Sequence, residues 1–186
     1  MSKAPANIVD RPLSKGKNEI NISSFAFLFS EMIQYCQDRI KAGHELEKKL
    51  SDMGYSIGPR LLELLCVREK NSKRETKLLG ILSFIHTTVW KSLFGKPADS
   101  LEKSTEADDE YMISDNNMVV NKFISLPKHL SSLNCAAFVA GIIEGILCSA
   151  EFPARVTAHN VAVEGKRFPK TVILIKFNPE VIERNA

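Results

Sequence analysis

The segment from Leu133 to Leu147 limits the fold of this chain more than any other. Its apolar residues fall on nearly every side at helical spacing, so a helix here has no face suited to water. The segment contains Asn134 and Glu144, and it is shorter than the roughly 20 apolar residues that span a membrane. We therefore expect a helix that is enclosed by the rest of the protein.

Four apolar segments have the composition of short β-strands. Residues 154–163 and 171–177 are rich in β-branched side chains and lie on either side of a basic turn. Upstream of the enclosed helix, residues 111–114 and 118–125 predict a hairpin that turns at residues 115–117. An enclosed helix that leads into a hairpin is typical of a sheet covered by helices.

Helical periodicity predicts four further helices, at residues 23–41, 46–53, 60–68 and 76–94. Ser23 is the candidate N-cap of the first of them. The acidic residues between Ala98 and Glu110 predict a solvated loop.

These elements predict one α+β domain, an α/β plait, with a four-stranded antiparallel sheet and about five helices packed on one face. We expect this domain to cover residues 22–180. Residues 1–21 predict a flexible basic N-terminal arm, and residues 181–186 predict a C-terminal tail.

The composition is that of an ordinary globular domain, and it argues against nucleic acid as a partner. The net charge is only +3, whereas nucleic-acid binding usually requires a clustered basic face. Four cysteines without paired spacing favour buried free thiols in a reducing compartment: Cys36, Cys66, Cys135 and Cys148. The first residues lack the apolar core of a secretory signal, so we expect a cytoplasmic protein.

No group of residues predicts catalysis, a metal site or a cofactor. Cys66 and His86 are the one thiol–base pair that we consider, and a core thiol beside a helix histidine is the alternative interpretation. Cysteine and histidine ligands at the short spacing of metal sites are absent from the sequence. We therefore expect no enzyme activity of the chain itself and no cofactor.

Two features indicate binding to another protein. The first is a surplus of large apolar side chains on the helices, which a small four-stranded sheet is not expected to bury in full: Phe25, Phe27, Phe29, Tyr35, Phe84, Trp90 and Phe94. Exposed apolar patches of this kind usually mark an oligomer interface or a lipid pocket. Gly141 and Gly145 also leave a shallow strip on the enclosed helix, where a partner or the protein's own backbone could approach.

Six sequence blocks together resemble the small adaptor-like subunits of the transport protein particle (TRAPP), and within that family the branch of subunit 5. The Trp-Lys version of the fourth block points to this branch. The resemblance extends from about Ser23 to Phe177, and the blocks are residues 24–31, 68–70, 74–80, 89–96, 133–144 and 152–159.

This resemblance implies an α/β plait that forms a heterodimer with an acylated sister subunit through its first two helices. The interface residues that it implies here are Phe25, Phe29, Met32, Cys36, Leu46 and Leu50. Phe29 and Met32 would be anchors of that contact. Another face would meet a longin-type subunit at the end of the complex. The resemblance also implies a non-catalytic core subunit of a complex that tethers vesicles between endoplasmic reticulum and Golgi, and that exchanges nucleotide on a Rab-type GTPase once assembled.

The resemblance has consequences for lipid and membrane contacts as well. The sister subunit carries its acyl chain on a cysteine whose position here is Lys70. Lys15 and Lys17 of the basic arm could contact an acidic membrane surface or the tail of the GTPase. We therefore expect a peripheral location at endoplasmic reticulum and Golgi membranes. The alternative interpretation is a stand-alone domain that binds a lipid or another small ligand.

Overall fold

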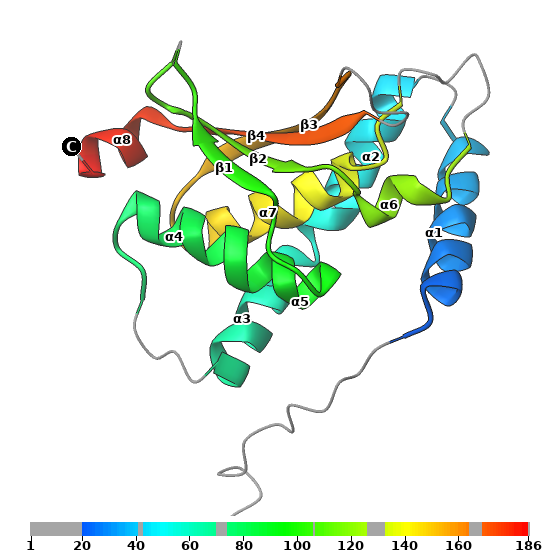
Figure 1. Ribbon diagram of the computed structural model, residues 1–186, viewed down its shortest axis with the longest axis horizontal. Helices are drawn as coiled ribbons and strands as arrows, with labels where there is room; N and C mark the ends of the chain where they lie inside the picture. Colours follow the sequence, from blue (N-terminus) through cyan, green and yellow to red (C-terminus); the bar gives the residue numbers. More distant parts are fainter. Residues whose placement is uncertain are drawn as a thin grey trace, which may run out of the picture.

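The computed structural model describes residues 20–40, 43–69, 74–105, 107–125, 133–163 and 169–185. Four strands form one antiparallel sheet in the order β1-β2-β4-β3, and the longer helices lie on one side of it (Figure 1). The predicted four-stranded antiparallel sheet with helices on one face is confirmed. The strands are β1 (Ser100–Lys103), β2 (Glu110–Asp115), β3 (Ala154–Val161) and β4 (Lys170–Phe177).

Five helical stretches agree in place with the predicted helices, and two short helices are additional. The predicted stretches are α1 (Ile22–Gln37), α2 (Gly43–Tyr55), α3 (Gly58–Glu69), the continuous run of α4 (Leu78–Phe84), η2 (Ile85–Val89) and α5 (Trp90–Phe94), and α7 (Ala137–Ser149). The additional helices are α6 (Val119–Lys122) and α8 (Pro179–Asn185). None of the described helices is long and apolar enough to cross a membrane.

The sheet turns one face of alternating side chains toward α7. Ile173, Ile175 and Phe177 of β4 are almost completely buried, and so are Ile113 of β2 and Val156 of β3. The register places these residues side by side across the sheet, since Ile113 pairs with Ile173 and Val156 pairs with Ile175. The alternation of buried and more exposed residues along the strands therefore determines which face of the sheet packs against α7.

Helix α7 is enclosed, as its sequence predicts. Ile143, Ile146 and Leu147 have no exposed surface, because the sheet covers one side of the helix and α2 and α3 cover the other (Figure 1). Glu144 is the one charged residue in α7, and its carboxylate Oε2 accepts the main-chain N–H of Val156 at 2.9 Å. The carboxylate of Glu144 therefore provides a hydrogen-bond acceptor for a main-chain N–H at the edge of the sheet.

Glycines let α2 and α3 contact the backbone of α7 directly. A Cβ atom on Gly141 would collide with the carbonyl oxygen of Ser51, and one on Gly145 would collide with the carbonyl oxygen of Tyr55. On the facing helix, a Cβ atom on Gly54 would collide with the carbonyl oxygen of Phe138. The glycine strip of α7 therefore packs against this protein's own helices.

The predicted helix at residues 76–94 begins at Leu78 and contains a π-helical turn. The turn η2 holds one more residue than an α-helical turn, which rotates the side chains that follow it. Trp90, the first residue after the turn, is fully buried. Gly95 ends the run in the left-handed conformation, with φ at 77°, as expected of a glycine after a helix.

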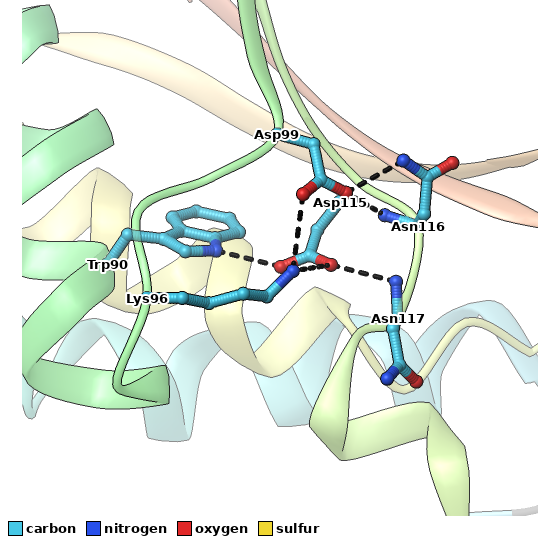
Figure 2. A network of polar contacts seen from close by, with 6 residues as sticks. All are labelled: Trp90, Lys96, Asp99, Asp115, Asn116 and Asn117. Carbon is cyan, nitrogen blue, oxygen red and sulfur yellow. Dashed lines mark hydrogen bonds and ion pairs between the residues drawn. The ribbon is translucent and has the colours of Figure 1, made fainter.

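A buried carboxylate joins the end of this helix to the sheet. Asp115 is 1% exposed and accepts three hydrogen bonds, as Figure 2 shows. The donors are Nε1 of Trp90 at 2.9 Å, Nζ of Lys96 at 3.0 Å and the main-chain N–H of Asn117 at 2.8 Å. Asp115 thus holds α5, the loop after it and the end of β2 in one arrangement.

A second carboxylate extends this polar network toward β1. Asp99 accepts two hydrogen bonds from Asn116, from the main-chain N–H and from Nδ2, both at 2.7 Å (Figure 2). The main-chain N–H of Asn116 is the largest cause that lowers the pKa of Asp99 below its usual value. Asp99 therefore stays ionised and keeps the loop before β1 beside the loop after β2.

The predicted hairpin is wrong in one of its two strands. Residues 111–114 do lie in β2, but residues 118–125 contain the short helix α6, and β1 lies in the segment 98–110 that predicted a loop. Only Leu101 of β1 stands opposite the buried Ile113, so this edge strand carries almost no apolar signal. The side chain of Asp115 accepts the N–H of Asn117, which bends the chain out of the sheet instead of into a hairpin.

The ends of the described chain also differ from the predicted boundaries. Asn21, and not Ser23, is the N-cap of α1, because its side chain accepts the N–H of Ser23 at 2.9 Å. Residues 181–185, which were expected in a tail, belong to α8. Val181 of α8 is buried, and Oδ1 of Asn185 accepts the N–H of Leu78 at 2.9 Å.

Replacing Gly141 by alanine should destabilise the protein, because the new methyl group would meet the backbone of Ser51. We expect the free energy of unfolding to fall by about 1–3 kcal/mol, as for overpacking in other cores. Gly80→Ala is the matched control, since a Cβ atom there would meet only the flexible side chain of Glu75. Urea unfolding followed by circular dichroism measures both, and equal effects would contradict the proposed backbone contact.

Replacing Asp115 by alanine should cost about 1–3 kcal/mol of stability, because it leaves the buried N–H of Trp90 without an acceptor. Lys96→Ala should cost less, about 1 kcal/mol or below, because Lys96 is 43% exposed and its partner keeps two other donors. Thermal unfolding of the two variants gives the comparison. If Lys96→Ala were the more harmful change, the ion pair and not the Trp90 bond would dominate the network.

Candidate protein-interaction surfaces

The predicted interface stripe on α1 packs against the protein's own helices. Phe29 is 3% exposed and Cys36 is 2% exposed, whereas Phe25 and Met32 are partly buried. The ring of Phe29 stacks on Phe25 and meets Phe138 of α7, with centroids 5.7 and 5.5 Å apart. Contact of these residues with a partner stays a prediction, and within this chain they hold α1 in place.

The two leucines predicted for the same interface lie deeper. Leu46 and Leu50 of α2 are 1% and 0% exposed and belong to the main core. Helix α2 packs along α7, so their side chains are enclosed between helices of this chain. Of the six predicted residues, only Phe25 and Met32 keep accessible surface.

The opposite side of α1 is apolar too, and it is exposed. Phe27, Leu28 and Tyr35 are 74%, 71% and 56% exposed, and we call these three residues the outer face of α1. Leu28 and Tyr35 lie seven residues apart, so they share one side of the helix over two turns. The guanidinium of Arg39 lies 3.6 Å from the ring centroid of Tyr35 and orients it. Figure 1 shows α1 at one side of the molecule.

A second exposed apolar patch lies at the start and along the length of α3. Ile57, Leu64 and Val67 are 38%, 36% and 63% exposed, and we call them the α3 patch. Helix α3 lies on the side of α7 away from the sheet (Figure 1). The chain therefore offers two apolar surfaces, on different helices, to other molecules.

An apolar groove runs between α1, α5, α6 and α7. Its volume is about 610 Å³, and its walls include Phe25, Phe94 and Phe138. Arg68 and Lys91 supply positive charge at its border. The Nε atom of Arg68 is buried and has no hydrogen-bond acceptor among the described residues. The groove thus combines apolar walls with a guanidinium whose Nε has no acceptor in the described part of the chain.

The structure does not support the thiol–base pair. Cys66 is exposed on α3 and His86 lies in η2, and among the described residues no hydrogen bond joins the two side chains. No group of three or more potential metal ligands occurs in the described part of the chain. Burial raises the pKa of the Cys135 thiol to about 11, so this thiol stays protonated near neutral pH. Lys15 and Lys17 lie outside the described residues.

Sequence reasoning indicated two residues of the outer face of α1, since Phe27 and Tyr35 are among the surplus of large apolar side chains, and both are exposed. It assigned Leu28 to the inner stripe, and it missed the α3 patch. The sequence does not show which side of the helix the protein's own core takes.

Comparison with known proteins gives consistent matches over nearly the whole chain. A family model described as transport protein particle (TRAPP) component matches residues 25–178. The chain is 99% identical to a trafficking protein particle complex subunit 5 from Dictyostelium discoideum over all 186 residues of both proteins. It is 42% identical to the Gallus gallus subunit 5, with 99% of this chain and 94% of the relative aligned. It is 33% identical to subunit 31 from Saccharomyces cerevisiae, with 98% of this chain and 84% of the relative aligned.

Among solved structures, a trafficking protein particle complex subunit 3 from Naegleria fowleri, covalently bound to palmitic acid, has the same fold. The TM-score is 0.70 at 19% sequence identity, and the match covers 84% of this chain and 95% of the other. At this identity the likeness supports the α+β fold and not a shared ligand.

The four thiols should react with an alkylating reagent at very different rates in the folded protein. Cys66 is exposed, Cys148 is partly buried, and Cys36 and Cys135 are buried. We expect rapid labelling of Cys66, slower labelling of Cys148, and labelling of the other two only after unfolding. Peptide mass spectrometry against time measures this order, and Cys66→Ser should remove the rapid phase alone. Rapid labelling of Cys135 would contradict the packing around α7.

Proposed function

The chain belongs to the transport protein particle (TRAPP) component family, and from that premise we propose that it acts as a non-catalytic core subunit of a vesicle-tethering complex. The relatives are named as subunits of a trafficking complex, so a role in vesicle trafficking follows from family membership. In the finer proposal, the chain joins its neighbours through the outer face of α1 and helps to assemble a nucleotide exchange factor for a Rab-type GTPase.

The observation that carries this proposal is the two-sided apolar character of α1. The inner stripe around Phe29 already fixes the helix on the protein, yet Phe27 and Leu28 remain about three-quarters exposed. A large apolar surface that the described part of the chain leaves exposed is typical of a subunit interface. Stable interfaces bury about 1,200–2,000 Å² in total, so α1 would supply the centre of such a contact and its neighbours the rest.

We propose that the partner on the outer face of α1 is an acylated sister subunit. The Naegleria fowleri relative is a subunit 3 that carries palmitic acid, which supports an acylated subunit as a neighbour within the same complex. We propose that the α3 patch meets a longin-type subunit, since a subunit inside an elongated complex needs two separate contacts. Leu64 and Val67 would lie at the second contact.

We further propose that the complex works between endoplasmic reticulum and Golgi, in the cytoplasm and at the membrane surface. The basic arm with Lys15 and Lys17 could contribute weak attraction to an acidic membrane or to the GTPase tail. Each positive charge near such a surface contributes only about 1 kcal/mol. The arm would therefore assist a membrane contact that the whole complex makes.

The double replacement Phe27→Glu with Leu28→Glu should weaken binding of the sister subunit by at least roughly tenfold without unfolding the chain. Both side chains are exposed, so charge there costs little in the free protein. Light scattering coupled to size-exclusion chromatography measures the complex, and circular dichroism checks folding. Leu79→Glu is the matched control, because Leu79 is also an exposed apolar residue, 68% exposed, but lies on α4.

Phe29→Glu separates the two sides of the helix in the same assay. It should unfold or loosen the chain, because it places a carboxylate against the rings of Phe25 and Phe138. Normal complex formation by the double variant would contradict the proposed interface. A wild-type monomer that ignores the sister subunit would contradict the adaptor function as a whole.

The second candidate function is binding of a lipid or another small ligand in the apolar groove beside α1. The observation in its favour is the apolar wall with the unpartnered Nε of Arg68 at its border, a combination suited to a fatty acid and its carboxylate. Mass spectrometry of the native protein distinguishes this function. A released acyl chain that Arg68→Met abolishes would favour it, and a ligand-free protein would favour the adaptor.

A further inference from the structure

A groove at one end of the molecule lies apart from the two surfaces proposed for assembly. It is found where the start of α4, the adjoining ends of β1 and β2, and α8 meet, and its volume is about 1,080 Å³. Figure 1 shows α8 and the start of α4 at the end of the molecule opposite α1. We call this space the α4–α8 groove, and Leu79, Tyr111 and Ile182 are among the residues that line it.

Side-chain contacts hold the walls of the α4–α8 groove in place. Oδ1 of Asn185 accepts the N–H of Leu78 at 2.9 Å, which attaches α8 to the first residue of α4. Nδ2 of Asn185 donates to the carbonyl oxygen of Val181 at 2.7 Å and so keeps the amide in this orientation. The ring of Tyr111 meets the buried ring of Phe177 edge-on, with centroids 5.8 Å apart. A groove with walls fixed in advance lowers the entropic cost of binding a ligand.

The charged side chains that line this groove are mainly positive. Lys77, Lys103 and Arg184 are cations, and Asp108 is the one carboxylate among the described lining residues. Asp108 binds Nζ of Lys103 at 2.6 Å, so this pair is neutral. Lys77 is exposed and forms no ion pair with another described residue. Arg184 donates to a neutral acceptor, the carbonyl oxygen of Glu151, at 2.7 Å. Two positive charges of the described lining therefore remain uncompensated.

The acidic residues at the start of β2 lie on the other face of the sheet. Asp109 and Glu110 both bind Nζ of Lys176, at 3.6 and 2.8 Å. Lys176 alternates along β4 with Ile175 and Phe177, which are buried on the helical side, so its side chain points to the opposite face. These two carboxylates therefore do not neutralise the α4–α8 groove.

The acidic residues near α8 also lie outside the lining. Glu183 is exposed and does not border the groove. Glu180 and Glu151 border a separate, smaller cavity of about 370 Å³, and Arg184 stands between the two spaces. The carboxylate of Glu151 binds Arg74 at 2.7 Å. The positive character of the α4–α8 groove therefore persists beside them.

An exposed leucine lies in the same groove as these cations. Leu79 is 68% exposed, and the partly buried Tyr111 and Ile182 line the groove with it. One exposed leucine is common on a protein surface, but this one shares a recess with Lys77 and Arg184. A ligand that matches the recess therefore carries both an apolar group and negative charges.

We propose that the α4–α8 groove binds a short acidic segment of a partner protein, in which aspartates or glutamates flank one large apolar side chain. The apolar side chain packs on Leu79, Tyr111 and Ile182. Lys77 and Arg184 bind the flanking carboxylates, and Lys103 can exchange its bond to Asp108 for a bond to the segment. This site lies on other elements than the outer face of α1 and the α3 patch, so it goes beyond the assembly function.

Other anionic ligands fit the groove less well. Its volume exceeds the roughly 300–1,000 Å³ of sites for small molecules, so one phosphate or a small dicarboxylate would fill little of it. A flat membrane surface does not enter a recess between two helices and a sheet. The net charge of the chain is only +3, which argues against nucleic acid.

The first test selects peptides on the full chain from a phage-displayed library of random dodecapeptides. Selected peptides should carry several aspartates or glutamates around a large apolar residue, and a synthetic copy of one of them serves as the probe. Its dissociation constant, measured by fluorescence anisotropy, should rise at least about threefold from about 50 to about 300 mM NaCl, because salt screens exposed charges. Selection of no binder, or of binders without acidic residues, would overturn the proposal.

The second test locates the peptide on the unaltered protein. In NMR spectra of protein with labelled methyl groups, the probe should shift the methyl resonances of Leu79 and Ile182. The methyl resonances of Leu28 and Ile57, on the outer face of α1 and the α3 patch, should stay in place. Shifts confined to Leu28 or Ile57 would place the acidic peptide elsewhere and contradict the proposed site.

Protein variants test the cation and the leucine separately. Lys77→Glu should weaken the probe about three- to tenfold, and Leu79→Ala should weaken it at least about threefold. Lys77 is exposed at the start of a helix, where a carboxylate is favourable, so the variant should fold. Lys49→Glu is the matched control, because it makes the same charge change at an exposed lysine of α2. Equal weakening by both charge reversals would show an effect of net charge alone and overturn the proposal.

Two further measurements separate this proposal from its rivals. Sedimentation with vesicles of phosphatidylcholine and phosphatidylserine should show no binding that depends on Lys77. Vesicle binding that Lys77→Glu abolishes and the peptide does not compete with would assign the groove to a membrane instead. In the sister-subunit assay, Lys77→Glu should form the complex normally, so failure of the peptide site and failure of the assembly function give different results.

Discussion

Direct contact between helix backbones at α7 is the constraint on which the other elements depend. Gly141 and Gly145 of α7 and Gly54 of α2 leave no room for a methyl group between the helices. Because α2 and α3 approach so closely, one side of α7 is closed by backbone and the other by the sheet. This packing fixes the position of α2, and with it the support for α1.

The polar network around Asp115 complements this apolar packing at the junction of α5 and β2. It connects α5 to β2 through Trp90 and to the loop before β1 through Lys96 and Asp99. The π turn places Trp90 on the buried side of the helix, where its Nε1–H donates to the buried carboxylate of Asp115. The π turn and the carboxylate therefore both stabilise the junction between α5 and β2. The edge strand β1, which has little apolar surface of its own, is held by this junction.

Much of the fold follows from sequence period, and the exceptions have physical reasons. The enclosed helix and the strands β3 and β4 were predictable, because long apolar runs with clear spacing have few alternatives. Strand β1 was missed because Leu101 alone contributes to the core, and α6 was mistaken for a strand because Val119 and Val120 are β-branched. The hydropathy pattern of a segment does not show whether that segment pairs as the edge strand of a sheet. It also does not show which side chain, such as that of Asp115, ends a strand.

The candidate site was predictable only in part, for a reason specific to α1. The sequence places the interface on the first helix, but Phe29 belongs to the inner stripe and Phe27 to the outer face. Both sides are apolar, so periodicity cannot say which of them the protein's own core takes. That choice depends on where α2 and α7 lie, which is a property of the whole chain.

The exposed outer face of α1 also affects the steady-state level of this protein in a cell. A copy that has not met its partner presents Phe27 and Leu28 to water, and chaperones and proteases act on such exposed apolar surface. If the outer face is covered in the complex, assembly removes that signal. The steady-state level of the chain would then follow the supply of its partner more closely than its own rate of synthesis, which gives a complex of fixed stoichiometry without a dedicated regulator.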